Sequence, residues 1–103
     1  MKESVSIQKN VSLEELLSIA RRCFPAYKSG TSKKIEGTYV YINRNSLFRV
    51  YLRVIQHKNG EYTLNICDGV TLLGSLLVYS IYGRSIMKPF FQEVKTAFVK
   101  ELS

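Results

Sequence analysis

"LFRVYLRVIQHKNGEYTLNIC", residues 47–67, is the stretch of sequence that decides the fold. Its first half alternates apolar side chains with Arg49, Tyr51 and Arg53, as a strand with one buried face does. The apolar members of this half are Phe48, Val50, Leu52 and Val54. Asn59–Gly60 follows, and this pair is the strongest short-range signal for a hairpin. The alternation then resumes, with inward positions at Tyr62, Leu64 and Ile66. The stretch therefore predicts an antiparallel hairpin with one apolar face and one face rich in arginine and tyrosine.

Upstream of this hairpin, the sequence predicts a strand followed by a helix. Residues 3–10 alternate polar and apolar side chains and indicate a short strand. Ser12 and Glu15 form a capping-box sequence, which marks the start of a helix. The apolar face of this helix holds Leu13, Leu16, Leu17, Ala20 and Phe24. Pro25 ends the helix, because a proline ring cannot continue the backbone hydrogen-bond pattern.

A connector and a second strand are predicted between this helix and the hairpin. Residues 26–34, "AYKSGTSKK", have the composition of turns and no periodicity, so we expect a mobile connector. Residues 35–43 predict a strand, and residues 43–46 predict a turn.

The last third of the chain predicts a turn, a strand and a helix. Asp68–Gly69 predicts the turn. Residues 75–82, "SLLVYSIY", indicate a strand that is apolar on both faces, as central strands are. Residues 83–102 predict a terminal helix with Pro89 in its first turn. The apolar face of that helix holds Phe90, Phe91, Val94, Ala97, Phe98 and Leu102.

These elements predict an α+β fold in a single domain spanning residues 1–103. The expected order is β-α-β-β-β-β-α. We expect an antiparallel sheet of four to five strands with both helices packed on one face, because the helical stripes and the apolar face of the hairpin can form one core.

Composition and charge narrow the function. The chain has 103 residues, a formal net charge of +7 and an isoelectric point near 9.6, which favours an anionic partner. The longest apolar run, residues 70–78, is about half of the ~18 residues that a transmembrane helix needs. Cys23 and Cys67 form no CxxC pair, so we expect two free, buried thiols in a reducing compartment. We therefore expect a protein that is soluble and intracellular, or peripheral to a membrane.

The sequence gives no support for catalysis or for a bound cofactor. The sole histidine, His57, lies beside the predicted hairpin turn with no carboxylate near it in the sequence, so we expect an exposed turn residue. The glycines form no phosphate-binding loop, and no histidine or cysteine lies at metal-ligand spacing. We expect no enzyme activity, no metal and no cofactor.

The positive charge is the remaining signal, and it points to two classes of anionic partner. Candidate anion-binding residues are the basic side chains that we expect to be exposed: Arg21, Arg22, Lys28, Lys33, Lys34, Arg44, Arg49, Arg53, Arg84 and Lys88. A sheet face with arginine and tyrosine, to which Tyr39 and Tyr41 could contribute, suits single-stranded nucleic acid. A basic loop at a helix end suits anionic lipid, with Phe24 or Tyr27 as an interfacial anchor.

The order of these segments resembles that of the kinase-associated-1 domain. This domain is a C-terminal module of eukaryotic Ser/Thr kinases such as the microtubule-affinity-regulating and septin-associated kinases. The resemblance lies in "SVSIQK" leading into "VSLEELLSIARRC", in the meander "LFRVYLRVIQHKNGEYTLNICDG", and in "LLVYSIYGRSIMKPFFQEVKTAFVKEL" with its Gly83–Arg84–Ser85 turn. It covers nearly the whole chain and is one of pattern, with no short invariant motif.

The resemblance favours lipid over nucleic acid as the partner. It implies a noncatalytic domain that binds acidic phospholipids, phosphatidylserine especially, through clustered basic residues. Such a domain would target a cytoplasmic kinase to the inner face of the plasma membrane, as a peripheral protein. It also implies a second partner, the kinase domain of the same protein, which such modules restrain in some family members. No kinase signature is present, so the kinase itself would lie outside this chain. A nucleic-acid-binding module that uses the basic, tyrosine-containing sheet face is the alternative.

Overall fold

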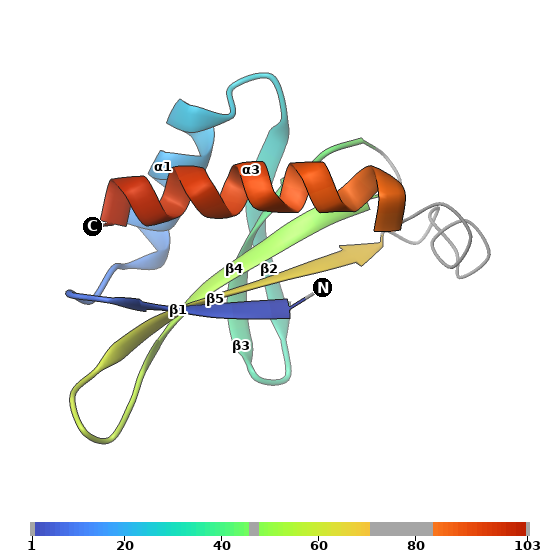
Figure 1. Ribbon diagram of the computed structural model, residues 1–103. Coiled ribbons are helices and arrows are strands. Elements are labelled where there is room, and N and C mark those ends of the chain that lie inside the picture. Colours follow the sequence, from blue (N-terminus) through green and yellow to red (C-terminus); the bar gives the residue numbers. More distant parts are fainter. Residues whose placement is uncertain (1, 46–47, 71–83, 103) are drawn as a thin grey trace.

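A computed structural model describes residues 2–45, 48–70 and 84–102 (Figure 1). The elements, in chain order, are β1 (Lys2–Ile7), α1 (Leu13–Cys23), β2 (Lys28–Lys34), β3 (Gly37–Asn43), β4 (Phe48–Gln56), β5 (Tyr62–Val70) and α3 (Arg84–Leu102).

The strands form one antiparallel sheet in the order β1-β5-β4-β3-β2. Both helices lie on the same side of this sheet (Figure 1). Helix α1 packs against β2 and β3, and α3 packs against β1, β4 and β5. The predicted α+β class, the element order and the two-layer arrangement are confirmed.

The core lies between the sheet and the helices, and alternation along the strands builds it. On β4, Val50 and Leu52 are fully buried, and their register partners Ile42, Val40 and Ile66 are buried with them. The largest fully buried side chains are Phe48, Phe91, Phe98, Leu16, Ile42, Leu52, Leu64, Ile66 and Met87. The core therefore uses the inward parity that the sequence predicted for the hairpin.

The first helix begins and ends where the sequence indicates. The Ser12 hydroxyl oxygen accepts a hydrogen bond from the Glu15 backbone N–H at 3.2 Å, as an N-cap does. The helix ends at Cys23, with Phe24 as its C-cap. Its predicted apolar face is wrong at one position, because Leu13 is 38% exposed in the first turn while Ile19 is buried.

The expectation of a mobile connector over residues 26–34 is wrong, because Lys28–Lys34 form the edge strand β2. This strand pairs with β3 from Lys28 opposite Asn43 to Lys34 opposite Gly37. Its sequence of lysine, serine, threonine and glycine has no alternation of its own. The neighbouring strand β3 supplies the pairing, and an edge strand exposed along one side tolerates polar residues.

The turn expected at Asp68–Gly69 is also wrong, because both residues continue β5. They lie opposite Val50 and Arg49 of β4. Glycine is required here for space, since a Cβ at position 69 would lie 2.6 Å from Cε2 of Tyr51.

Two further expectations concern the end of the chain. Pro89 is not in the first turn of the terminal helix, because α3 begins at Arg84 and holds Pro89 in its interior. A proline there removes one backbone hydrogen bond near the start of a long helix whose other face is packed in the core. The strand expected at residues 75–82 lies outside the described residues.

The two predicted turns flanking β4 are confirmed as far as they are described. The His57 N–H donates to the Glu61 carbonyl at 2.8 Å, closing the β4–β5 hairpin around Asn59–Gly60, and Gly60 has a φ of 86°. Between β3 and β4, the Arg44 N–H donates to the Phe48 carbonyl at 3.0 Å. His57 is exposed at its hairpin, as expected.

Candidate anion-binding site

The side of the sheet opposite the helices carries an interleaved set of cations and tyrosine rings, which we call the distal face. Strand β2 contributes Lys34, strand β3 contributes Tyr39 and Tyr41, and strand β4 contributes Arg49, Tyr51 and Arg53. Register fixes this arrangement, because Tyr41 lies opposite Tyr51 while the alternate residues Val40 and Leu52 are buried. The outward positions predicted for Arg49, Tyr51 and Arg53 are confirmed, and Tyr39 and Tyr41 are their neighbours.

Lys34, Arg49 and Arg53 each lie against a tyrosine ring. The ammonium nitrogen of Lys34 is 3.8 Å from the ring centre of Tyr51 and 5.5 Å from that of Tyr39. The guanidinium carbon of Arg49 is 4.3 Å from the ring centre of Tyr41, and that of Arg53 is 5.6 Å from Tyr39. Contacts of this kind attract a cation to the negative face of a ring. They therefore hold the charges of three long side chains at defined positions on the sheet.

The backbone of the distal face is shaped to let these side chains lie flat. Gly37 has a φ of 135°, and a Cβ there would lie 2.9 Å from the guanidinium carbon of Arg53. Gly69 leaves the same kind of room for the ring of Tyr51. Glycine at these two positions lets a guanidinium and a ring approach the backbone more closely than any other residue would.

One acid, Glu36, lies beside the distal face in the β2–β3 turn, and internal contacts engage it. A hydrogen bond to its own backbone N–H lowers the pKa of its carboxyl most, and a hydrogen bond with Tyr39 and the charges of Lys34 and Arg53 lower it further. Burial is the main cause that raises the pKa of the Tyr39 hydroxyl. The neighbourhood of Glu36 keeps an excess of positive charge, with Lys34 and Arg53 against this one carboxylate.

Two polar atoms at the β3–β4 side of the distal face have no partner among the described residues. These are Oδ1 of Asn43 and Nε of Arg49, which are buried and without a hydrogen bond. The two residues lie directly opposite one another in the sheet. The contact of Arg49 with the Tyr41 ring therefore holds its guanidinium without using the Nε donor.

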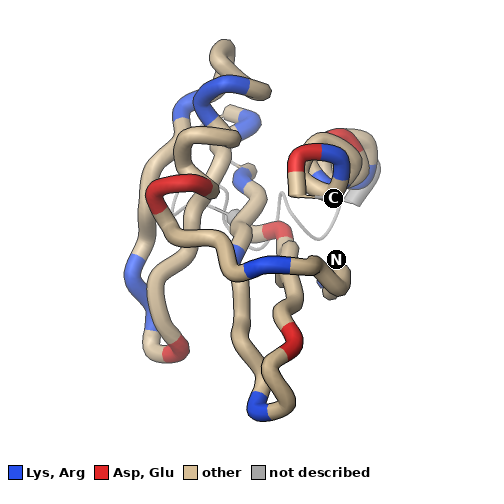
Figure 2. Tube along the Cα trace, turned by 90° about the vertical axis from the view of Figure 1, so that its left-hand side faces the viewer, with Lys and Arg blue, Asp and Glu red and all other residues tan. Residues whose placement is uncertain are grey.

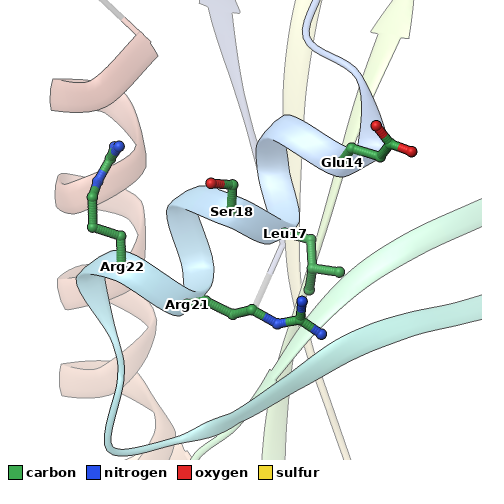
Figure 3. A pocket seen from close by; sticks show the side chains of 5 residues that line it. All are labelled: Glu14, Leu17, Ser18, Arg21 and Arg22. Atoms are coloured by element: carbon green, nitrogen blue, oxygen red, sulfur yellow. The ribbon is translucent and has the colours of Figure 1, made fainter.

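The two arginines at the end of α1 do not join the distal face. Arg22 donates to the Glu101 carboxylate of α3 at 2.5 Å, so it links the two helices. Arg21 lines an open cleft with Glu14, Leu17 and Ser18, and the two arginines point in different directions (Figure 3). The sequence predicted that these arginines would act together with Lys33 and Lys34. In the structure the two groups lie at opposite ends of β2, because the arginines precede this strand and the two lysines end it.

The remaining candidates are spread over the molecule (Figure 2). Lys28 and Arg44 border a second open cleft at the start of β2. Lys33 lies roughly 17 Å along the strand from Lys28, at about 3.3 Å per residue, and is exposed. Lys88 is exposed on α3. Arg84 is the first residue of that helix, and its side chain lies outside the described part. The ten candidates therefore form no single surface.

The structure also reveals a residue that sequence reasoning missed. Residues 35–43 were expected to form a strand, but β3 begins at Gly37, and Ile35 and Glu36 form the turn between β2 and β3. The side chain of Ile35 is fully exposed. One feature of the sequence could have indicated this turn: Ile35 is an apolar residue that directly follows Lys33–Lys34 and lies two positions before Gly37.

Neither cysteine forms a disulfide, and both are half-buried, so the expectation of buried thiols is wrong in degree. Cys67 lies opposite Tyr51 on the distal face, and burial raises the pKa of its thiol. Cys23 lies at the end of α1, where its Sγ is 3.8 Å from Glu101.

Over the described ranges 2–45, 48–70 and 84–102, no group of three or more potential ligand side chains could hold a metal ion. Within the same ranges, no helix is both long enough and apolar enough to cross a bilayer. Comparisons with protein-family models, with curated proteins and with solved structures found no match to this chain.

Proposed function

We propose that this chain is a noncatalytic domain that binds anionic membrane lipids through the distal face. The observation that carries the proposal is the set of three cations, Lys34, Arg49 and Arg53, held over tyrosine rings on one side of the sheet. The further proposal that the domain belongs to a protein kinase and targets it to the membrane is supported only by the sequence resemblance described above.

The chemistry of the distal face suits lipid headgroups. Guanidinium groups donate paired hydrogen bonds to phosphate and carboxylate oxygens, and phosphatidylserine offers both. Each cation near an anionic membrane contributes on the order of 1 kcal/mol, so the three together would contribute roughly 3 kcal/mol. That is the range of reversible, salt-sensitive docking to a membrane.

The geometry favours lipid over single-stranded nucleic acid. Bases stack on open aromatic faces, whereas the ring of Tyr51 is covered by Lys34 and this residue is only 8% exposed. A guanidinium likewise lies over the ring of Tyr41. Nucleic acid remains the alternative because cations and tyrosines share one sheet face, and Tyr39 and Tyr41 are partly exposed.

Vesicle sedimentation tests the proposal. The full chain should sediment with phosphatidylcholine vesicles that contain phosphatidylserine and should stay in solution with phosphatidylcholine alone. Equal binding to both vesicles, or no binding to either, would contradict it. Fluorescence anisotropy with single-stranded RNA tests the alternative. If the alternative is correct, the chain should bind the RNA tightly, Tyr51→Ala should abolish this binding, and the chain should not bind either kind of vesicle.

A further inference from the structure

Ile35 is the most exposed large apolar side chain among the described residues, and it is the starting point of the inference. In the described part of the chain, Leu13 on α1 is the other large apolar side chain classed as exposed, at 38%, whereas Ile35 is fully exposed. A single exposed apolar residue is common on protein surfaces. The surroundings of Ile35 therefore decide whether its exposure has a function.

The β2–β3 turn holds Ile35 beyond the end of the paired strands. Lys34 and Gly37 form the last register pair of β2 and β3, so Ile35 and Glu36 make a two-residue connection. The views in Figures 1 and 2 show this turn at the opposite end of the molecule from the C-terminal end of α1. A tight turn at the tip of a hairpin presents its side chains with little backbone freedom.

The charges around this turn favour an anionic surface. Lys33 and Lys34 directly precede Ile35, and both belong to the same hairpin. Glu36, which follows Ile35, is itself exposed, and a hydrogen bond to its own backbone N–H, a hydrogen bond with Tyr39 and the charges of Lys34 and Arg53 lower the pKa of its carboxyl. The tip therefore presents a fully exposed isoleucine directly after two lysines, with one exposed carboxylate directly after it.

We propose that the β2–β3 turn is the segment of this domain that enters the bilayer, with Ile35 inserted at the boundary between headgroups and acyl chains. Lys33 and Lys34, which point to opposite faces of β2, bind anionic headgroups beside the inserted side chain. This inference rests on the proposed membrane function and adds that, when the distal face lies on the membrane, the β2–β3 turn is the part of the domain that lies deepest in the lipid. Apolar side chains and flanking cations act together in this way at membrane interfaces.

A tryptophan reporter tests the insertion directly, because the chain contains no tryptophan of its own. In Ile35→Trp, fluorescence emission should shift to the blue with phosphatidylserine-containing vesicles and should be quenched by lipids brominated on the upper acyl chain. The matched control is Leu13→Trp, which places the reporter at an exposed apolar position on α1. Its emission should not change with the same vesicles.

A second variant measures the contribution of the side chain to binding. Ile35→Ser should weaken binding to phosphatidylserine-containing vesicles about tenfold, since burial of one isoleucine side chain is lost. Leu13→Ser is the control and should bind as the unmodified chain does. Neither substitution should lower the melting temperature appreciably, because Ile35 is fully exposed and Leu13 is exposed in the first turn of α1.

The outcomes separate this inference from the proposed function. If the unmodified chain sediments with acidic vesicles but the tryptophan of Ile35→Trp stays in water and Ile35→Ser binds normally, insertion is wrong while electrostatic binding stands. If the unmodified chain does not bind acidic vesicles, both are wrong. An emission shift that appears without vesicles and grows with protein concentration would instead identify a contact between copies of the chain, and would also overturn the insertion.

Discussion

The ammonium group of Lys34 lies 3.8 Å from the ring centre of Tyr51, although β3 separates the strands that carry them. The side chain of Lys34 therefore crosses a strand to reach the ring. We expect Lys34→Gln to lower the free energy of unfolding by about 0.5–1 kcal/mol, because the cation–π contact is lost. Urea denaturation measures this change.

The neighbouring lysine provides the control for this prediction. Lys33→Gln removes the same charge from the same strand, but Lys33 lies on the other side of β2. Its stability should stay within error of the unmodified chain, whereas both variants should bind acidic vesicles more weakly. Equal stability of the two variants would show that the ring contact of Lys34 contributes nothing to folding.

The two arginines of β4 should dominate binding to anionic lipid. The double substitution Arg49→Gln/Arg53→Gln should weaken binding to phosphatidylserine-containing vesicles roughly 30-fold, taking on the order of 1 kcal/mol per cation. The control Arg21→Gln/Lys100→Gln removes the same charge from exposed positions on α1 and α3. If the two double variants lose affinity equally, binding depends on net charge and not on the distal face. Raising the salt concentration should weaken binding of the unmodified chain.

Arg22 should matter to neither lipid binding nor, to any large extent, stability. Its ion pair with Glu101 joins α1 to α3, but both side chains are partly exposed to solvent. Exposed pairs of this kind contribute about 0–1 kcal/mol, so Arg22→Gln should lower the free energy of unfolding by no more than that. Thermal unfolding and vesicle sedimentation check the two parts. A tenfold loss of lipid binding in this variant would show that the C-terminal end of α1 does take part in lipid binding.

Much of the fold could be predicted because its signals are local. The alternation along residues 47–67 correctly predicted which side of β4 and β5 faces the core. It also predicted that Arg49, Tyr51 and Arg53 lie together on the other side. The capping serine and the apolar stripes likewise gave both helices. These patterns depend on the period of the strand or helix and on neighbouring residues, so they can be recognised without tertiary structure.

What the sequence did not reveal depends on contacts between distant segments. Strand β2 has no alternation, and its pairing comes from β3. Glycine is typical of turns, yet Gly69 continues β5. It leaves room for the Tyr51 ring of the adjacent strand, which occupies the space that a side chain at position 69 would need. Ile35 is exposed because β2 ends at Lys34 and the turn begins at the next residue. The sequence did not predict β2, so it could not predict that Ile35 lies at a hairpin tip.

Gly69→Ala tests the steric account of that strand. The added Cβ would lie 2.6 Å from Cε2 of Tyr51, so the ring must move or the strands must separate. We expect a loss of about 1–3 kcal/mol in the free energy of unfolding, as for other overpacked sites. Urea denaturation measures it, and the double variant Gly69→Ala/Tyr51→Ala supplies the test of cause. When Tyr51 is already truncated, Gly69→Ala should lower the free energy of unfolding only slightly. If the loss is as large as in the presence of Tyr51, the contact with the Tyr51 ring is not its cause.

The ion pair between Glu3 of β1 and Lys95 of α3 should make stability depend on pH in the acidic range. Nζ of Lys95 lies 2.8 Å from Oε1 of Glu3, and this hydrogen bond is the main cause that lowers the pKa of the Glu3 carboxyl. Because the folded pKa is below the ordinary value, the stabilisation is fully present above that ordinary value. It is lost as the pH falls through the folded pKa, because the unfolded chain takes up the proton first.

Glu3→Gln should therefore be less stable than the unmodified chain at neutral pH, and the difference should shrink as the solution is acidified. Thermal unfolding of both proteins from neutral pH down to strongly acidic pH measures this convergence. Glu93→Gln is a suitable control, because it removes an exposed carboxylate from the same helix, α3, that carries Lys95. A difference between Glu3→Gln and the unmodified chain that stays constant across this range would mean that the carboxylate charge of Glu3 does not stabilise the contact between β1 and α3.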